Sequence, residues 1–183
     1  MEKKFERSLI AAGFGGQGLM VLGQMVAYTG MHEGRNVTWI PSYGPEMRGG
    51  TANCSVIISE DQIGSPVVPE ADYVLVMNQP SLTKFEPMLK SGGMLFYNSD
   101  LVKLEKKRDD IKVYAIPANT IANELGNEKV ANIVMLGALV AAGDMVGEGP
   151  ALEMLDDKLG HKKPEFIPMN RSAFQKGKEA VNK

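Results

Sequence analysis

The sequence GFGGQG, residues 13–18, has the G-x-G-x-x-G spacing that holds the pyrophosphate of a dinucleotide in many α/β proteins. It follows a short apolar run and precedes a helical stretch, which is the context that this chemistry needs. Glycines let a backbone approach phosphates closely, and the first turn of the helix offers unpaired N–H groups to an anion. The spacing therefore predicts a phosphate-binding loop made of Gly13, Gly15, Gly16, Gln17 and Gly18.

A dinucleotide site also needs an acidic residue about 20 residues further on, at the end of the second strand, where it binds the ribose hydroxyls. Here that strand ends in WIPSYG, which contains no carboxylate. This absence argues against an independent NAD(P) or flavin enzyme, which stays open as an alternative. A structural role is also open: the glycines, together with Gly23, Ala27 and Gly30 along one side of the helix, would only let helix and strand pack closely.

A second glycine-rich segment, SYGPEMRGG at residues 42–50, stands where the acidic residue is missing. It is full of turn-forming residues, and it would bring Ser42, Tyr43 and Arg48 near the first loop if both lie at one edge of a sheet. The planar guanidinium of Arg48 suits a phosphate or a carboxylate, from a ligand or from another subunit. An internal ion pair between Glu46 and Arg48 is the alternative.

Thiol and imidazole chemistry has little support in the sequence. The chain has one cysteine and two histidines that lie far apart, which is a poor set of metal ligands. Cys54 falls where small and apolar residues alternate with polar ones, so we expect a buried and inert thiol on one face of a strand. His32 falls in the last turn of a helix and His161 in a loop, without catalytic partners in sequence. We therefore assign no catalytic residue and no metal ligand.

Composition limits the class of protein. The 183 residues are 44% hydrophobic, which suits the core of one globular domain spanning residues 1–183. The formal net charge of −2 gives no overall basic field for nucleic acid or for an anionic membrane. One cysteine suits a reduced compartment, and no signal peptide is recognised after the charged N-terminus. The sequence therefore predicts a cytoplasmic protein.

Short apolar runs alternate with helical patterns along the chain. This order predicts a single-domain, three-layer α/β/α fold with a mostly parallel, Rossmann-like sheet and helices on both of its faces. We expect strands at residues 8–12, 36–40, 51–59, 72–78, 92–98 and 112–118, and helices at residues 16–33 and 80–89. Strand ends at Gly13, Asn78, Asn98 and Asn119 would gather where open α/β sheets bind ligands. The plainer interpretation is that glycine and asparagine make turns there.

Two further stretches have a clear character. VANIVMLGALVAA, at residues 130–142, is apolar nearly all round a helix but too short to cross a bilayer. We expect it to be buried, inside this chain or against another. LEKKRDD, at residues 104–110, is a mixed charge run and predicts a solvated turn.

Taken together, the two glycine-rich segments resemble a known family. GFGGQG followed by SYGPEMRGGTANCSVIIS and GSPVV is similar to the gamma subunit of the 2-oxoacid:ferredoxin oxidoreductases. The similarity continues through ADYVLVMNQPSL, GGMLFYNSDL and NIVMLGAL, and the second segment looks more like the 2-oxoglutarate or ketoisovalerate type than the pyruvate type. The resemblance implies oxidative decarboxylation of a 2-oxoacid to an acyl-CoA, with thiamine diphosphate carrying the carbanion chemistry and iron–sulfur clusters passing electrons to ferredoxin.

This chain lacks several parts of such an enzyme. A 4Fe-4S cluster needs four thiolates, and GDMVGEG at residues 143–149 breaks the Gly-Asp-Gly pattern of thiamine diphosphate sites. The resemblance therefore implies that partner subunits hold thiamine diphosphate, Mg²⁺ and the clusters, and that ferredoxin is met only indirectly. It implies a chain that is inactive alone and serves as a structural subunit, with coenzyme A (CoA) as the ligand that it would position. An assembly module that contacts only protein is the remaining alternative.

Overall fold

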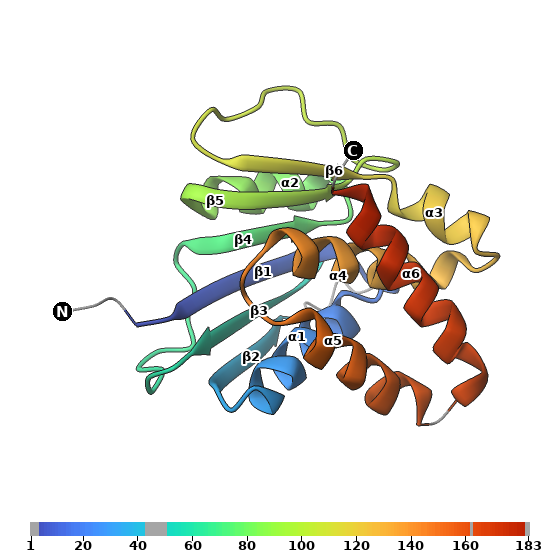
Figure 1. Ribbon diagram of the computed structural model, residues 1–183. Coiled ribbons are helices and arrows are strands. Elements are labelled where there is room, and N and C mark those ends of the chain that lie inside the picture. Colours follow the sequence, from blue (N-terminus) through green and yellow to red (C-terminus); the bar gives the residue numbers. More distant parts are fainter. Residues whose placement is uncertain (1–3, 43–50, 162, 182–183) are drawn as a thin grey trace.

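The computed structural model describes residues 4–42, 51–161 and 163–181. Within these residues, six strands form one sheet in the order β2–β3–β1–β4–β5–β6 (Figure 1). The strands are β1 (Glu6–Phe14), β2 (Asn36–Ser42), β3 (Thr51–Ser59), β4 (Ala71–Val76), β5 (Leu89–Asn98) and β6 (Lys112–Ile116). β1, β4, β5 and β6 pair in parallel, whereas β3 runs antiparallel to both β1 and β2. The predicted mostly parallel sheet is confirmed, with β3 as its reversed strand.

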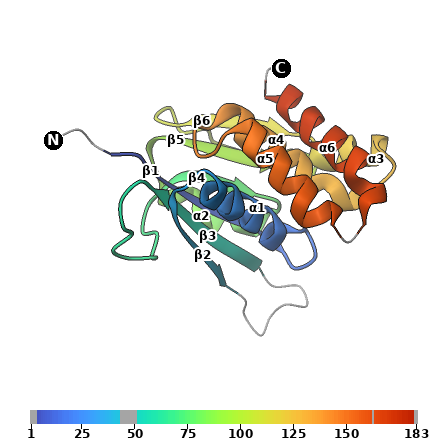
Figure 2. The ribbon, with the colours of Figure 1, turned by 60° about the horizontal axis from the view of Figure 1, so that its bottom comes forward.

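The helices cover the two faces of the sheet unequally. They are α1 (Leu19–His32), α2 (Gln79–Phe85), α3 (Ala118–Glu124), α4 (Ala131–Ala142), α5 (Glu148–Leu155) and α6 (Ile167–Ala180). α1, α4, α5 and α6 lie on one face, and α2 lies on the other (Figures 1 and 2). The three layers are as predicted, but among the described residues the second helical layer is the short helix α2.

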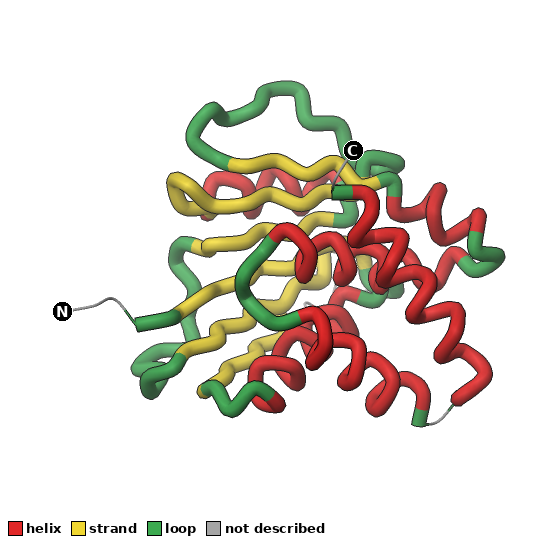
Figure 3. The backbone as a smooth tube through the Cα atoms, viewed as in Figure 1, coloured by secondary structure: helices red, strands yellow, loops and turns green. Residues whose placement is uncertain are grey.

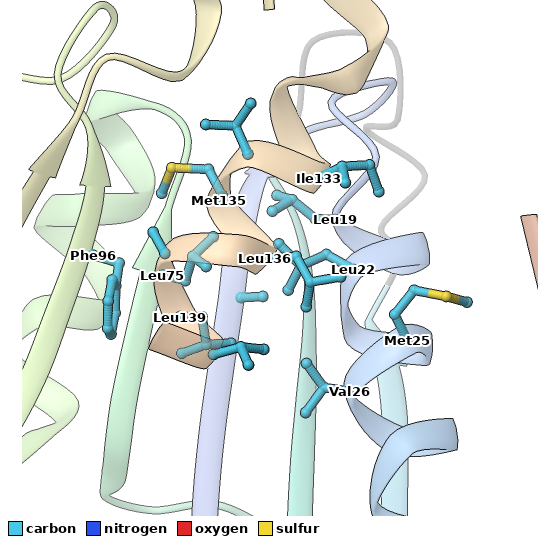
Figure 4. Packing of buried hydrophobic residues seen from close by; sticks show 14 of the residues in the cluster. Leu19, Leu22, Met25, Val26, Leu75, Phe96, Ile133, Met135, Leu136 and Leu139 are labelled. Carbon is cyan, nitrogen blue, oxygen red and sulfur yellow. The ribbon is translucent and has the colours of Figure 1, made fainter. Parts of the chain in front are cut away.

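The apolar helix α4 lies at the centre of the larger core. Ten of its twelve residues are buried, which explains why nearly all of its sides are apolar. The helices and strand that contact it are α1, α3, α5, α6 and β5. Leu136 of α4 lies beside Leu22 of α1 above the sheet (Figure 4). The sequence left open whether this helix is covered by its own chain or by another, and the structure shows that its own chain covers it.

Small residues allow α1 to lie close to β2 and β3. A Cβ added at Gly23 would lie 2.4 Å from the Sγ of Cys54, and one added at Gly30 would lie 2.7 Å from the Cδ1 of Ile58. Ala27, between them, is buried on the same side. The close-packing role expected for these three residues is confirmed.

Most element bounds shift by a few residues from the sequence-based prediction, and the helix expected at residues 80–89 ends at Phe85, with β5 beginning at Leu89. Figure 3 shows the helices and strands along the backbone. Two of the differences have a local cause. The first helix begins at Leu19 and not at residue 16, because Gly16 and Gly18 adopt φ values of 94° and 76°, outside the right-handed helical region. Asn119 does not end a strand: β6 ends at Ile116, and Asn119 lies in the first turn of α3. Pro117 explains this difference, because it has no N–H to continue the ladder of the sheet.

Candidate functional site at the carboxyl edge of the sheet

The carboxyl ends of β1, β4 and β5 meet at one edge of the sheet. The chain leaves β1 through α1 toward β2 on one side, and leaves β4 through α2 toward β5 on the other. The edge between β1 and β4 is therefore a topological switch point, where open α/β sheets form a ligand crevice. A cavity of about 320 Å³ opens there. It is lined by Gly16, Gln17, Met77, Leu101, Asn119, Glu128, Lys129 and Ala131.

The glycine loop is held rigidly at this edge. The Oε1 atom of Gln17 accepts a hydrogen bond from the N–H of Phe14 at 2.7 Å, and its Nε2 donates to the carbonyl of Met77 at 3.1 Å. Gly13 has no room for a side chain, since an added Cβ would lie 2.6 Å from the Cδ1 of Leu19 and 3.0 Å from the Cβ of Met77. These contacts give Gly13 and the amide of Gln17 a role in the fold and leave the backbone of the loop as the surface for a ligand.

The first turn of α1 presents backbone donors beside this loop. The first intrahelical hydrogen bond joins the N–H of Leu22 to the carbonyl of Gly18 at 3.0 Å, so the N–H groups before Leu22 have no helical acceptor. No side chain caps this end of the helix. A second cavity of about 220 Å³ lies here. Its lining consists of Phe14, Gly15, Gly16, Gly18, Leu19, Met20, Val21 and Ala52. This combination of unpaired N–H groups and the positive end of the helix dipole attracts an anion.

The second glycine-rich segment is described only at its ends. Ser42 is exposed at the end of β2 and pairs with Asn53 of β3. Thr51, at the start of β3, pairs with Phe14 beside the glycine loop. Tyr43 and Arg48 lie outside the described residues, as does Glu46. Both ends of the segment thus belong to the same edge of the sheet as the first loop, while the roles of Tyr43 and Arg48 stay predictions.

Amide side chains build the far wall of the larger cavity. Asn98 is fully buried, and its Oδ1 accepts two backbone hydrogen bonds at 3.2 Å from the turns that follow β5 and β6. Its Nδ2 donates to the Oδ1 of Asn119 at 2.6 Å, and the Nδ2 of Asn119 donates to the Oε1 of Glu128 at 3.2 Å. Asn78 caps α2 by accepting from a backbone N–H. The turn-forming role is confirmed for Asn78 and Asn98, whereas Asn119 lies in α3. The chain of hydrogen bonds from Asn98 through Asn119 to Glu128 orders the cavity wall.

Sequence reasoning missed the charged residues of this wall. Glu128 and Lys129 belong to a short turn before α4, and the only available signal was the polar sequence GNEK ahead of an apolar helix. Lys129 is exposed and lines the cavity. Within the parts of the chain that the structure describes, no carboxylate forms a salt bridge with it. Lys129 therefore supplies a cation close to Gly16.

Asp144, from the segment at residues 143–149, serves the opposite edge of the sheet. The Nε of Arg7 donates to its Oδ1 at 2.7 Å, and the hydroxyl of Tyr73 donates to the same oxygen. The hydrogen bond from Arg7 lowers the pKa of Asp144 to about 2. Burial, helped by the hydrogen bond to Asp144, raises the pKa of Tyr73 to about 12. The carboxylate is therefore engaged inside the fold, away from the glycine loop.

The thiol and the imidazoles lie apart from the cavity. Cys54 is fully buried, its Sγ donates to the carbonyl of Leu19, and burial raises the pKa of the thiol to about 11. The expected burial of this thiol is confirmed. His32 lies in the last turn of α1, 3.1 Å from the carboxylate of Glu153, and His161 is exposed. The described residues contain no group of three or more His, Cys, Asp or Glu side chains that could hold a metal ion. No helix among them is long and apolar enough to cross a bilayer.

The sequence is similar to curated proteins of one family. Residues 8–180 match the profile of pyruvate ferredoxin/flavodoxin oxidoreductase. The ketoisovalerate oxidoreductase subunit VorA of Methanothermobacter marburgensis is 42% identical over 132 residues, which are 72% of this chain and 27% of that protein. The 2-oxoglutarate synthase subunit KorC of Methanocaldococcus jannaschii is 32% identical over 181 residues, which are 97% of this chain and 95% of that protein. The chain thus spans about a quarter of VorA and nearly all of KorC.

Solved structures share the fold. The gamma subunit of a keto/oxoacid ferredoxin oxidoreductase from Geobacter sulfurreducens has a TM-score of 0.82 and 35% identity, over 96% of this chain and 98% of that one. A 2-oxoglutarate:ferredoxin oxidoreductase from Magnetococcus marinus, with 2-oxoglutarate, coenzyme A and succinyl-CoA bound, has a TM-score of 0.88 and 27% identity, over 99% of this chain and 32% of that one. The resemblance seen in the two glycine-rich segments is confirmed: this chain belongs to the pyruvate ferredoxin/flavodoxin oxidoreductase family and is similar to its gamma subunits.

Proposed function

We propose that this chain is the gamma-type subunit of a multi-subunit 2-oxoacid:ferredoxin oxidoreductase, which oxidatively decarboxylates a 2-oxoacid to an acyl-CoA. Similarity to KorC along nearly the whole of both chains favours 2-oxoglutarate as the substrate, and similarity to VorA makes ketoisovalerate the second choice. Thiamine diphosphate, Mg²⁺ and the 4Fe-4S clusters then belong to partner subunits, which meet ferredoxin. The cytoplasmic location expected from the sequence is part of this proposal.

Within that complex the chain positions CoA. The observation that carries this role is the glycine loop, held at the switch point with unpaired N–H groups of α1 on one side and a cavity of about 320 Å³ on the other. A CoA molecule offers phosphates to such donors and an apolar pantetheine chain to walls such as Leu101 and Met77. The residues proposed for this site are Gly13, Gly15, Gly16, Gln17, Gly18, Ser42, Tyr43 and Arg48, joined by Lys129.

These residues have different roles in the proposed binding of CoA. The backbone of Gly15 and Gly16 and the first turn of α1 would take a phosphate, and Lys129 and Arg48 would neutralise its charge. Gly13 and Gln17 support the site by fixing the loop against β4. The thiol end of CoA would leave the cavity toward the partner subunit that carries out the carbon chemistry. A module that contacts only protein is the rival function, favoured by the packing roles of Gly13 and Gln17.

Arg48→Ala and Lys129→Ala in the reconstituted complex test this role, with Lys106→Ala in the exposed charge run as the matched control. Loss of a charged donor to a phosphate costs about 1.5–3 kcal/mol, so we expect the KM for CoA to rise about 10- to 100-fold. Reduction of the complex by 2-oxoacid in the absence of CoA should keep its rate. Lys106→Ala should behave as the wild type.

Two outcomes would contradict the CoA role. Normal turnover of both variants at low CoA concentration would mean that the cations do not bind phosphate and that the glycines serve packing. Failure of Arg48→Ala to join the partner subunits, measured by size-exclusion chromatography with light scattering, would make Arg48 an interface residue instead.

A further inference from the structure

Part of one face of β2 and β3 is left half-buried or exposed by the described residues. Val37 and Trp39 of β2, and Cys54 and Ile58 of β3, face α1, where they contact the positions of Gly23 and Gly30. Side chains alternate along a strand, so their neighbours point to the other face of the sheet. On that face α2 packs mainly over β1 and β4, and the buried cluster that it belongs to includes Ile57 of β3. Figure 2 shows β2 and β3 extending beyond the helical layer.

The composition of this uncovered surface is unusual for a face in water. We call its half-buried and exposed part, toward the glycine loop, the β2–β3 face; it consists of Phe14 at the end of β1, Thr38, Ile40 and Ser42 of β2, and Asn53 and Ser55 of β3. None of these residues is charged, although 23% of the chain is. Phe14 and Ile40 keep 39% and 40% of their surface exposed. Depletion of charge around exposed large apolar side chains is the mark of an interface centre.

The edge position of β2 strengthens this argument. β2 is the last strand on its side of the sheet, and its sequence NVTWIPS contains no charged residue. Edge strands that face water are usually protected by lysine or other charges against pairing with foreign strands. Here the only such protection within the strand is Pro41. The edge of β2 and the β2–β3 face both lack charged residues, so they are suited to permanent burial against another protein surface.

We propose that the β2–β3 face is the docking surface for a partner polypeptide. This partner corresponds to the part of the longer relatives that lies outside the domain they share with this chain. This domain makes up only 27% of VorA and 32% of the Magnetococcus marinus chain, so in those proteins it is joined to much more protein. An uncharged face fits an equally uncharged protein surface, whereas nucleic acid or an anionic membrane would need cations. The inference rests on the proposed function and names the interface that it requires.

The position of Phe14 links this face to the candidate site. Phe14 lies on the β2–β3 face by strand alternation and also lines the cavity at the start of α1. A partner seated on the face would therefore reach the rim of the glycine loop. It would shield a CoA bound there from water and receive its thiol end. A second copy of this chain would bring no group that reacts with that thiol, which is why the partner is a different polypeptide.

Charge insertion on this face provides the test. Ile40 and Ser55 are paired across β2 and β3, so Ile40→Lys/Ser55→Lys places two cations at its centre. Asn53→Lys/Ser55→Lys does the same at positions that are already polar, and it serves if the first variant unfolds. Met31→Lys, on α1 and 60% exposed, is the matched control on the other side of the sheet. Far-UV circular dichroism and urea unfolding of each isolated chain check the fold.

Association with the co-expressed thiamine-binding and iron–sulfur subunits is measured by sedimentation and light scattering. We expect the double-lysine variants to bind at least about tenfold more weakly, because unpaired charges buried at an interface are costly, and Met31→Lys to bind like the wild type. Undiminished assembly of a folded double-lysine variant would overturn the inference while leaving the proposed function intact. A loss of self-association with normal assembly would also overturn it, in favour of a second copy. Failure of the wild-type chain itself to assemble would refute the proposed function and the inference with it.

Discussion

The carboxylate of Asp144 accepts hydrogen bonds from Arg7 and Tyr73, and its pKa of about 2 lies below the usual value of about 3.9. A lowered pKa in the folded state contributes stability that is complete above about pH 4 and is lost as the pH falls toward 2. Tyr73 affects stability at high pH. Because its pKa rises to about 12, the unfolded chain ionises first and stability falls as the pH rises from about 10.

Urea unfolding at several pH values checks both effects. Between pH 4 and 2 the free energy of unfolding should fall less steeply in Asp144→Asn than in the wild type, since the substituted side chain has no proton to take up. Between pH 10 and 12 the same should hold for Tyr73→Phe. If the free energy of unfolding of each variant changes with pH as steeply as that of the wild type in its pH range, the pKa shifts assigned to Asp144 and Tyr73 are wrong.

At the scale of elements, α4 and α6 cross with almost no space between their backbones. A Cβ added at Gly137 would lie 2.0 Å from the carbonyl oxygen of Phe174, and one added at Gly177 would lie 1.8 Å from that of Val134. Alanine normally stabilises a helix by about 1 kcal/mol relative to glycine. Here a rigid backbone atom blocks the methyl group, so Gly137→Ala should lower the free energy of unfolding by about 1–3 kcal/mol.

Gly149 is the matched control for this substitution. It lies in α5, and an added Cβ would meet nothing within 4 Å. Gly149→Ala should therefore leave the urea midpoint unchanged or raise it, with the same m-value in all three proteins. A Gly137→Ala protein as stable as the wild type would mean that α4 and α6 separate easily, and that their crossing does not define the core.

For the molecule as a whole, the proposed function predicts that the purified chain is colourless and does not oxidise 2-oxoacids alone. Its single cysteine cannot supply the four thiolates of a cubane cluster. Absorbance spectra and reduction of an artificial electron acceptor, with and without the partner subunits, measure this. A flavin or cluster spectrum, or 2-oxoacid oxidation by the isolated chain, would refute the subunit role.

Local patterns determined much of this protein. The strand at residues 51–59 was predicted with the bounds that β3 has. Apolar alternation placed Cys54 on a buried face, and the two glycine-rich segments indicated the family. These features succeed because a period of 2 or 3.6 residues, or a turn that requires glycine, is a property of neighbours in sequence.

Tertiary structure alone decided the rest. No local sequence pattern shows whether β3 runs parallel or antiparallel to its neighbours. The direction depends on its pairing with β1, whose residues lie about 45 positions from their partners in the sequence. The amide of Gln17 looked free for a ligand until the fold brought the carbonyl of Met77 to it, 60 positions along the chain. Lys129 joined the candidate site for the same reason. A side chain's role depends on which distant groups reach it first, and only the packed chain determines those neighbours.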